Sequence, residues 1–182
     1  MNPSADKAYL FEQMPVPQAV RRQIFPSIAS QMVLLLYNLA DTYFVGLLND
    51  PPQTAAVSVA YTITVLMTAI ANLFAVGGAS CMARAMGRHD TVSARRIAAI
   101  SFWWCLFSAV LFSGVFALFA SPLLRLCGAT AETYALAFRY AKWVVVWGGT
   151  CAILNILLAN LMRAEGSAGL ASAGVSLGGI IN

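Results

Sequence analysis

The chain has 182 residues, of which 60% are apolar and only 10% are charged, and its mean hydropathy is +0.75. Soluble domains carry about 25% charged residues, so this composition argues against a soluble enzyme and indicates an integral membrane protein. The net charge of +4 comes from basic residues spread among the ends of apolar segments, so no nucleic-acid partner is expected.

Apolar segments predict an all-α, polytopic membrane helix bundle with four full transmembrane helices and the start of a fifth. The predicted spans cover residues 24–48, 54–82, 97–119, 134–161 and 170–182. Residues 1–22 are polar and rich in proline, and we expect a cytoplasmic tail there, followed by the bundle at residues 23–182. Because the fifth apolar segment stops at Asn182, short of a full crossing, we expect the chain to be part of a larger bundle.

The lysines and arginines predict an orientation in the membrane. They fall between alternate spans, with Lys7, Arg21, Arg22, Arg84, Arg88, Arg95, Arg96 and Arg163 on one side and Arg125, Arg139 and Lys142 on the other. Loops rich in basic residues stay in the cytoplasm. We therefore expect a multi-pass protein of the cell (inner) membrane, in contact with the lipid bilayer and with its N-terminus in the cytoplasm.

Asp41 is the one acidic residue within the first predicted span. A carboxylate near the middle of a membrane helix costs about 2.5–3.5 kcal/mol, so such residues usually face protein or water and serve a function. On a helix, Gln31, Asn38 and Thr42 fall with Asp41 in a stripe about 100° wide. The stripe predicts a polar cavity beside the outer half of this span, although Asp41 could instead reach the interface as a plain helix-end residue.

A second polar stripe follows in the next span. Tyr61, Thr68 and Asn72 fall within about 40° of one another at helical spacing, so we expect them to line the same cavity.

Known enzymatic and metal-binding patterns are absent from the sequence. The single histidine, His89, has no ligand-like spacing to any cysteine, and no phosphate-binding loop or nucleophile motif is present. We therefore predict no enzymatic activity, no bound metal and no organic cofactor.

Four motifs occur in a fixed order along the chain. They are YNLADTYFVG at residues 37–46, the Gly77–Gly78 pair followed by ARAMG at 83–87, LMRAEG at 161–166, and GGIIN at 178–182. Together they resemble the multidrug and toxic compound extrusion (MATE) family of cation-coupled antiporters, in its bacterial multidrug-export branch.

The resemblance implies the N-terminal portion of a two-lobe transporter that exports amphipathic or cationic drugs in exchange for H⁺ or Na⁺. It assigns cation coupling to Asp41 and Asn182, and an aspartate expected four residues after Asn182 lies beyond the sequence. Tyr37, Asn38 and Thr42 would hold Asp41 in place. The missing C-terminal helices of the parent transporter would be partners of this chain.

Two alternatives stay open from the sequence. The chain could be a non-transporting membrane fragment or interaction module, which its end within an apolar segment favours. It could also be a flippase of lipid-linked precursors with a related fold, but such proteins line their cavity with basic residues, and these spans contain almost none.

Overall fold

The computed structural model describes residues 13–47 and 50–181, with side chains as far as residue 177. This part of the chain forms helices and short connections without a strand, which confirms the predicted all-α class. The elements are α2 (Val16–Leu47), α3 (Pro51–Gly87), α4 (Thr91–Leu126), α5 (Tyr134–Ala141), the π-helix η2 (Lys142–Gly148), α6 (Gly149–Ala164) and α7 (Ala168–Ile181).

Four helical segments are long and apolar enough to cross a membrane, as predicted. They are α2, α3, α4 and the continuous run from Tyr134 to Ala164 that joins α5, η2 and α6. The helices are longer than the predicted spans, since the 37 residues of α3 extend about 55 Å, well beyond an apolar layer of about 30 Å. Residues 16–22, predicted as part of the tail, form the first turns of α2, where Pro17 is tolerated because the first helical N–H groups need no intrahelical acceptor.

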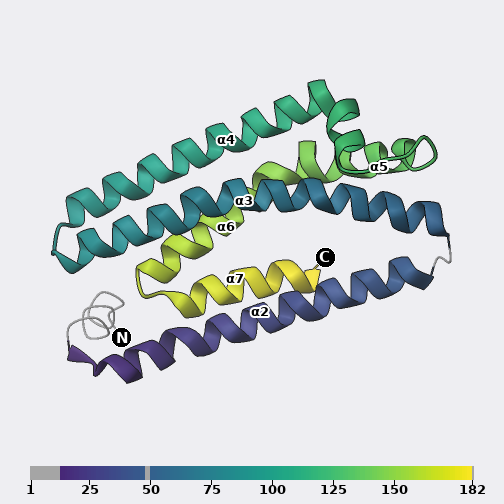
Figure 1. The fold of residues 1–182 in the computed structure, drawn as a ribbon. Helices are drawn as coiled ribbons and strands as arrows, with labels where there is room; N and C mark the ends of the chain where they lie inside the picture. The colour runs from purple at the N-terminus through teal and green to yellow at the C-terminus, as the bar shows by residue number, and fades with distance from the viewer. Residues whose placement is uncertain (1–12, 48–49, 182) are drawn as a thin grey trace.

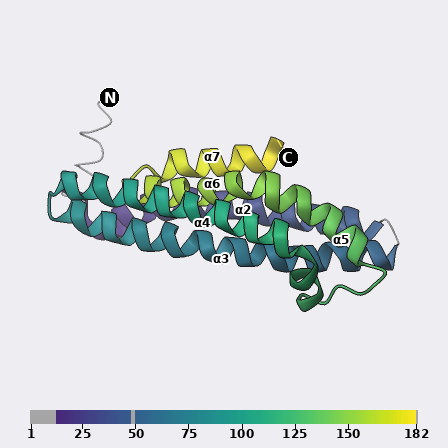
Figure 2. The same ribbon diagram turned by 90° about the horizontal axis from the view of Figure 1, so that it is seen from above.

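The third span continues past residue 119, where we expected it to end. Ser121 and Pro122 lie inside α4, which ends at Leu126, and the backbone leaves helical geometry at Phe119 (φ −116°, ψ 27°). A proline removes one helical hydrogen bond and its ring clashes with the preceding turn, so the helix bends there instead of ending. The last turns of α4 consequently turn away from its main axis (Figures 1 and 2).

Helix α3 is the centre of the packed part of the bundle. It packs extensively against α4 and α6, and also against α5. Helix α2, its neighbour in sequence, touches α3 only sparsely and instead packs along α7, which lies between α2 and α6 (Figure 1). The end of α2 and the start of α3 are thereby left without close mutual packing.

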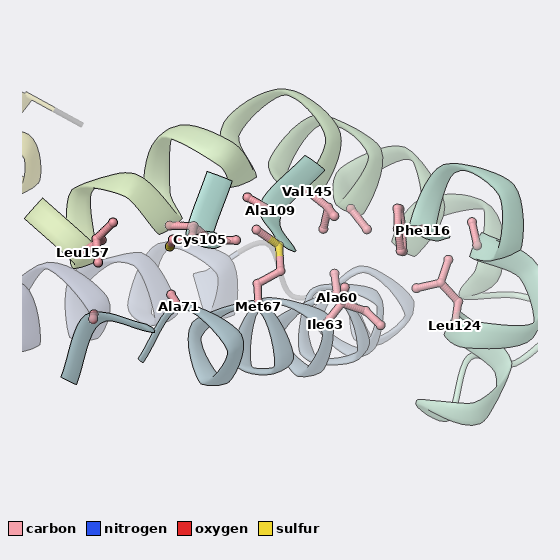
Figure 3. Close-up of a cluster of buried hydrophobic side chains, with 14 of the residues drawn as sticks. Ala60, Ile63, Met67, Ala71, Cys105, Ala109, Phe116, Leu124, Val145 and Leu157 are labelled. Carbon is pink, nitrogen blue, oxygen red and sulfur yellow. The ribbon is translucent and has the colours of Figure 1, made fainter. Parts of the chain in front are cut away.

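The core is a seam of small and medium apolar residues on one face of α3. Ala60, Ile63, Met67 and Ala71 are at most 4% exposed and point toward α4 and α6 (Figure 3). Alanine at helical spacing lets helix backbones approach closely, which is the main source of attraction between helices where lipid is as apolar as the side chains.

The π-helix η2 interrupts the fourth span beside this core. Its Val145 is fully buried, and the hydroxyl of Ser113 from α4 donates a 3.2 Å hydrogen bond to the Val145 carbonyl oxygen. A π-turn shifts the backbone hydrogen-bonding register, so a polar side chain from a neighbouring helix can supply an additional partner.

The charged ends of the bundle follow the predicted pattern. The α3–α4 and α6–α7 connections lie at the same end as the start of α2. The end of α2, the start of α3 and the α4–α5 connection lie at the other end (Figure 1). The described basic residues are therefore divided as the sequence predicts, while Lys7 lies outside the described residues. Which end faces the cytoplasm stays a prediction.

A candidate cation-binding cavity

A cavity of about 460 Å³ lies between α2, α3 and α5, near the end of the bundle that holds the α2–α3 connection. It exists because α2 packs only sparsely against α3. Its lining consists of Tyr37, Asn38, Asp41, Thr42 and Val45 of α2, Thr54, Val57, Ser58, Tyr61 and Thr64 of α3, and Tyr140 of α5.

The α2 wall carries the charge of the site. Asp41 is exposed to the cavity, with Asn38 and Tyr37 one turn before it on the same side of the helix. The hydroxyl of Thr42 donates a 2.9 Å hydrogen bond to the carbonyl oxygen of Asn38. That bond uses the hydroxyl proton and leaves the lone pairs of the Thr42 oxygen available as acceptors.

The α3 wall repeats this arrangement of hydroxyl groups. Ser58 donates to the Thr54 carbonyl at 3.0 Å, and Thr64 donates to the Tyr61 carbonyl at 2.7 Å. Each hydroxyl proton is thus engaged within the helix. The serine and threonine hydroxyls of both walls accordingly present oxygen acceptors to whatever occupies the cavity.

Tyr140 closes the third side of the cavity from α5. Together with Tyr37 and Tyr61 it places three tyrosines, one from each helix, around Asp41. Aromatic rings attract cations through their negative faces, most strongly where water is excluded. Sequence reasoning missed Tyr140, because nothing in its own segment indicates that α5 packs beside α3 at the level of Asp41.

The predicted site residues separate into two groups in the structure. Tyr37, Asn38, Thr42 and Tyr61 share the cavity with Asp41, whereas Gln31 lines a different crevice with Arg163. Thr68 and Asn72 are exposed further along α3 and do not line the cavity, because each helical turn moves a side chain about 5.4 Å along the axis. Asn182 lies outside the described residues.

Sequence reasoning also missed Thr54, Ser58 and Thr64. Their signal was present, because Thr54 and Ser58 extend the Tyr61 stripe at helical spacing toward the start of the span. The prediction followed that stripe only in the opposite direction, toward Thr68 and Asn72.

The chemistry of the lining favours a cation. Asp41 supplies a carboxylate, the other polar groups supply amide, hydroxyl and ring acceptors, and no lysine or arginine lines the cavity. Within residues 13–47 and 50–181, no group of three or more His, Cys, Asp and Glu side chains is arranged to hold a metal ion. The cavity is thus suited to a monovalent or organic cation held by one carboxylate and several neutral oxygens.

The fold resembles solved transporter structures. A MOP superfamily transporter from Pyrococcus furiosus, described as having a binding pocket of reverse polarity, has a TM-score of 0.86 and 28% identity, over 95% of this chain and 37% of its own. An outward-facing conformation of a multidrug resistance MATE family transporter of that superfamily has a TM-score of 0.81 and 29% identity, over 88% and 35%.

Sequence comparison points the same way. The chain is 25% identical over 162 residues to the multidrug export protein MepA of Staphylococcus aureus, covering 89% of this chain and 36% of that protein. MepA of Staphylococcus saprophyticus is 23% identical over 177 residues, covering 97% and 39%. The chain thus spans little more than a third of the length of these relatives. Since the MatE family model matches residues 26–179, the chain belongs to the MatE family, which its four motifs resemble.

Proposed function

We propose that this chain forms the cation-binding part of a multidrug exporter, which moves amphipathic or cationic small molecules out of the cell in exchange for H⁺ or Na⁺. The observation that carries the proposal is the single cavity in which Asp41, neutral oxygen acceptors and three tyrosines meet without a basic residue. The similarity to multidrug export proteins supports the same substrate class.

One of the similar structures is described as having a binding pocket of reverse polarity. The charge that this cavity prefers therefore has to be inferred from its own lining residues. Here the lining contains one carboxylate and no lysine or arginine. A flippase of pyrophosphate-linked lipids needs basic groups at its cargo site, so this lining favours a cationic cargo over that alternative.

Asp41 is the proposed coupling residue. In this mechanism it alternates between a protonated or Na⁺-bound form and an ionised form that attracts the drug. Competition between the coupling ion and the cargo for one carboxylate links their movements in opposite directions. Exchange of one entering cation for an uncharged drug moves one net charge, which gains about 2.3 kcal/mol per 100 mV. One-for-one exchange for a monovalent cationic drug moves no net charge, so that export draws on the concentration gradient of the coupling ion.

The test uses a cationic dye, ethidium, and two aspartate variants. Asp41→Asn removes the cavity carboxylate. Asp50→Asn removes a carboxylate at the same end of the bundle, which accepts a hydrogen bond from the Gln53 side chain and does not line the cavity. By fluorescence polarisation of the purified chain, we expect Asp41→Asn to weaken ethidium binding about tenfold, the loss of one charge-assisted contact, and Asp50→Asn to leave it unchanged. Equal ethidium binding by the native chain and both variants would contradict a role for Asp41 in the binding site.

Transport is tested separately in proteoliposomes, with the 182-residue chain and with a longer form that supplies further helices. Imposed H⁺ and Na⁺ gradients identify the coupling ion through the rate of ethidium efflux. Efflux that responds to neither gradient, with dye binding intact, would contradict antiport and support the alternative of a binding fragment. Gradient-driven efflux that persists in Asp41→Asn would contradict the coupling role.

A further inference from the structure

A second crevice, of about 510 Å³, lies along the first half of α2, away from the cation cavity. Its wall is one face of α2 between Gln23 and Leu35, and Arg163 from the last turn of α6 completes it. The crevice lies at the end of the bundle that gathers most of the basic residues.

The guanidinium of Arg163 has unused hydrogen-bonding capacity in this crevice. Its Nε is buried and has no acceptor among the residues that the structure describes. Arginine stays charged at all relevant pH values, and a buried charged donor without an acceptor is costly. Glu165, the nearest acid in sequence, does not line the crevice. An anionic oxygen bound there would offset the cost through a charge-assisted hydrogen bond.

The rest of the wall is mostly apolar, with Gln23, Ser27 and Gln31 as its polar members. Ile28, Met32 and Leu35 line the crevice and are each more than half exposed, so much of their surface is left uncovered by the described residues. Leu35 lies about 10 Å further along α2 than Ile28, toward the middle of the bundle. The crevice therefore joins one cationic group to an apolar strip that runs inward from the basic end.

We propose that this crevice binds an anionic phospholipid, with its phosphate at Arg163 and an acyl chain along Ile28, Met32 and Leu35. A membrane leaflet supplies both parts of such a ligand at the correct depth, a phosphate at the interface and a hydrocarbon chain below it. A free inorganic phosphate would leave the apolar strip uncovered. This site is separate from the cation cavity and does not depend on the proposed transport activity.

Native mass spectrometry of the purified chain in detergent tests the proposal with phosphatidylglycerol, phosphatidylcholine and inorganic phosphate. We expect phosphatidylglycerol to bind at a concentration about tenfold lower than phosphatidylcholine, the difference made by one charge-assisted contact. Arg163→Gln should abolish this preference. Arg95→Gln removes the same charge from an exposed position at the same end of the bundle, outside the crevice, and should retain it.

A second pair of variants tests the apolar strip while leaving Arg163 in place, so the proposal stays testable if Arg163→Gln fails to fold. Leu35→Trp fills the crevice and should weaken the binding of both lipids, whereas Leu36→Trp, on a different face of α2, should not. An unchanged phosphatidylglycerol preference in Arg163→Gln, or equal binding in both tryptophan variants, would overturn the proposal. So would displacement of phosphatidylglycerol by inorganic phosphate, because it would indicate a small-anion site.

Discussion

The side of α3 that faces α4 and α6 and the side that faces α2 belong to one helix but differ in almost every property. On the packed side, Ile63 and Ala71 are fully buried, whereas on the cavity side Tyr61 is 65% exposed. Helix α2 lies opposite the cavity side of α3, and Ser30 is the only buried residue among those described in α2. Tight packing and an open polar surface thus lie about 100° apart around one helix.

The difference shows how the bundle separates stability from chemistry. In lipid, helices are held together by close van der Waals packing of small residues, so the alanine-rich side of α3 is expected to carry the stability. The cavity side keeps polar groups that a packed interface could not satisfy, and it can bind and release an ion without disturbing the core. Three pairs of variants and one single substitution test how stability is distributed.

The largest expected effect is in the buried core that the packed side of α3 shares with its neighbouring helices. Phe116→Ala removes a ring that is 1% exposed, and we expect a loss of about 3 kcal/mol in the free energy of unfolding, because the vacated space cannot collapse fully. Phe107 is on the same helix but 58% exposed, so Phe107→Ala should change the free energy of unfolding by no more than about 0.5 kcal/mol. Reversible unfolding by dodecyl sulfate in mixed micelles, followed by circular dichroism, measures both. Equal losses would contradict the assignment of stability to the buried core.

The next effect concerns the glycine pair of α3. A Cβ atom at Gly78 would lie 2.8 Å from the Cβ of Ser101 and would collide with its hydroxyl, whereas one at Gly77 would meet no neighbouring atom within 4 Å. We expect Gly78→Ala to destabilise the bundle by about 1–3 kcal/mol through overpacking. Gly77→Ala should be neutral or stabilise it by up to about 1 kcal/mol, because alanine favours a helix. The same unfolding assay measures both variants. A loss of stability in Gly77→Ala would contradict the absence of close neighbours around Gly77.

A smaller effect is expected at the π-helix. Ser113→Ala removes the buried hydrogen bond to the Val145 carbonyl and should cost about 1 kcal/mol. Ser58→Ala removes a serine hydroxyl from the cavity side, where it bonds only to its own helix, and should leave the unfolding free energy nearly unchanged. A larger loss in Ser58→Ala than in Ser113→Ala would reverse the assignment of stability to the packed side.

The smallest effect is at the turn that joins the two packed helices. Asp90 caps α4, and hydrogen bonds from the Ser93 side chain and backbone lower the pKa of its carboxyl. A lowered pKa means that the cap stabilises the fold above the unfolded-state pKa and is lost as the pH falls through the folded-state value. An asparagine at position 90 can still cap the helix, but its side chain does not titrate. Acidification from about pH 7 to about pH 3 should therefore lower the unfolding midpoint of the native chain slightly more than that of Asp90→Asn. If acidification lowered the unfolding midpoints of the native chain and of Asp90→Asn by the same amount, this role of the Asp90 carboxyl would be excluded.

Much of this molecule follows from the sequence, because membrane helices are defined by local composition. Four long apolar segments, and the charged residues between them, are properties of consecutive residues, and the structure confirms the spans. Asp41 also stands out locally, since a carboxylate in an apolar span is costly whatever surrounds it. Helical periodicity placed Asn38 and Thr42 on its side of the helix, and the family resemblance added Tyr37.

Only the tertiary structure decided which residues meet Asp41. Tyr140 joins the cavity because α5 packs beside α3, and Gln31 leaves it because the cavity covers only part of the α2 stripe. Helical periodicity gives the face of a residue, but not which neighbouring helix covers that face or at what depth. Those depend on long-range packing, here on α2 joining α7 instead of α3, and no local pattern encodes that choice.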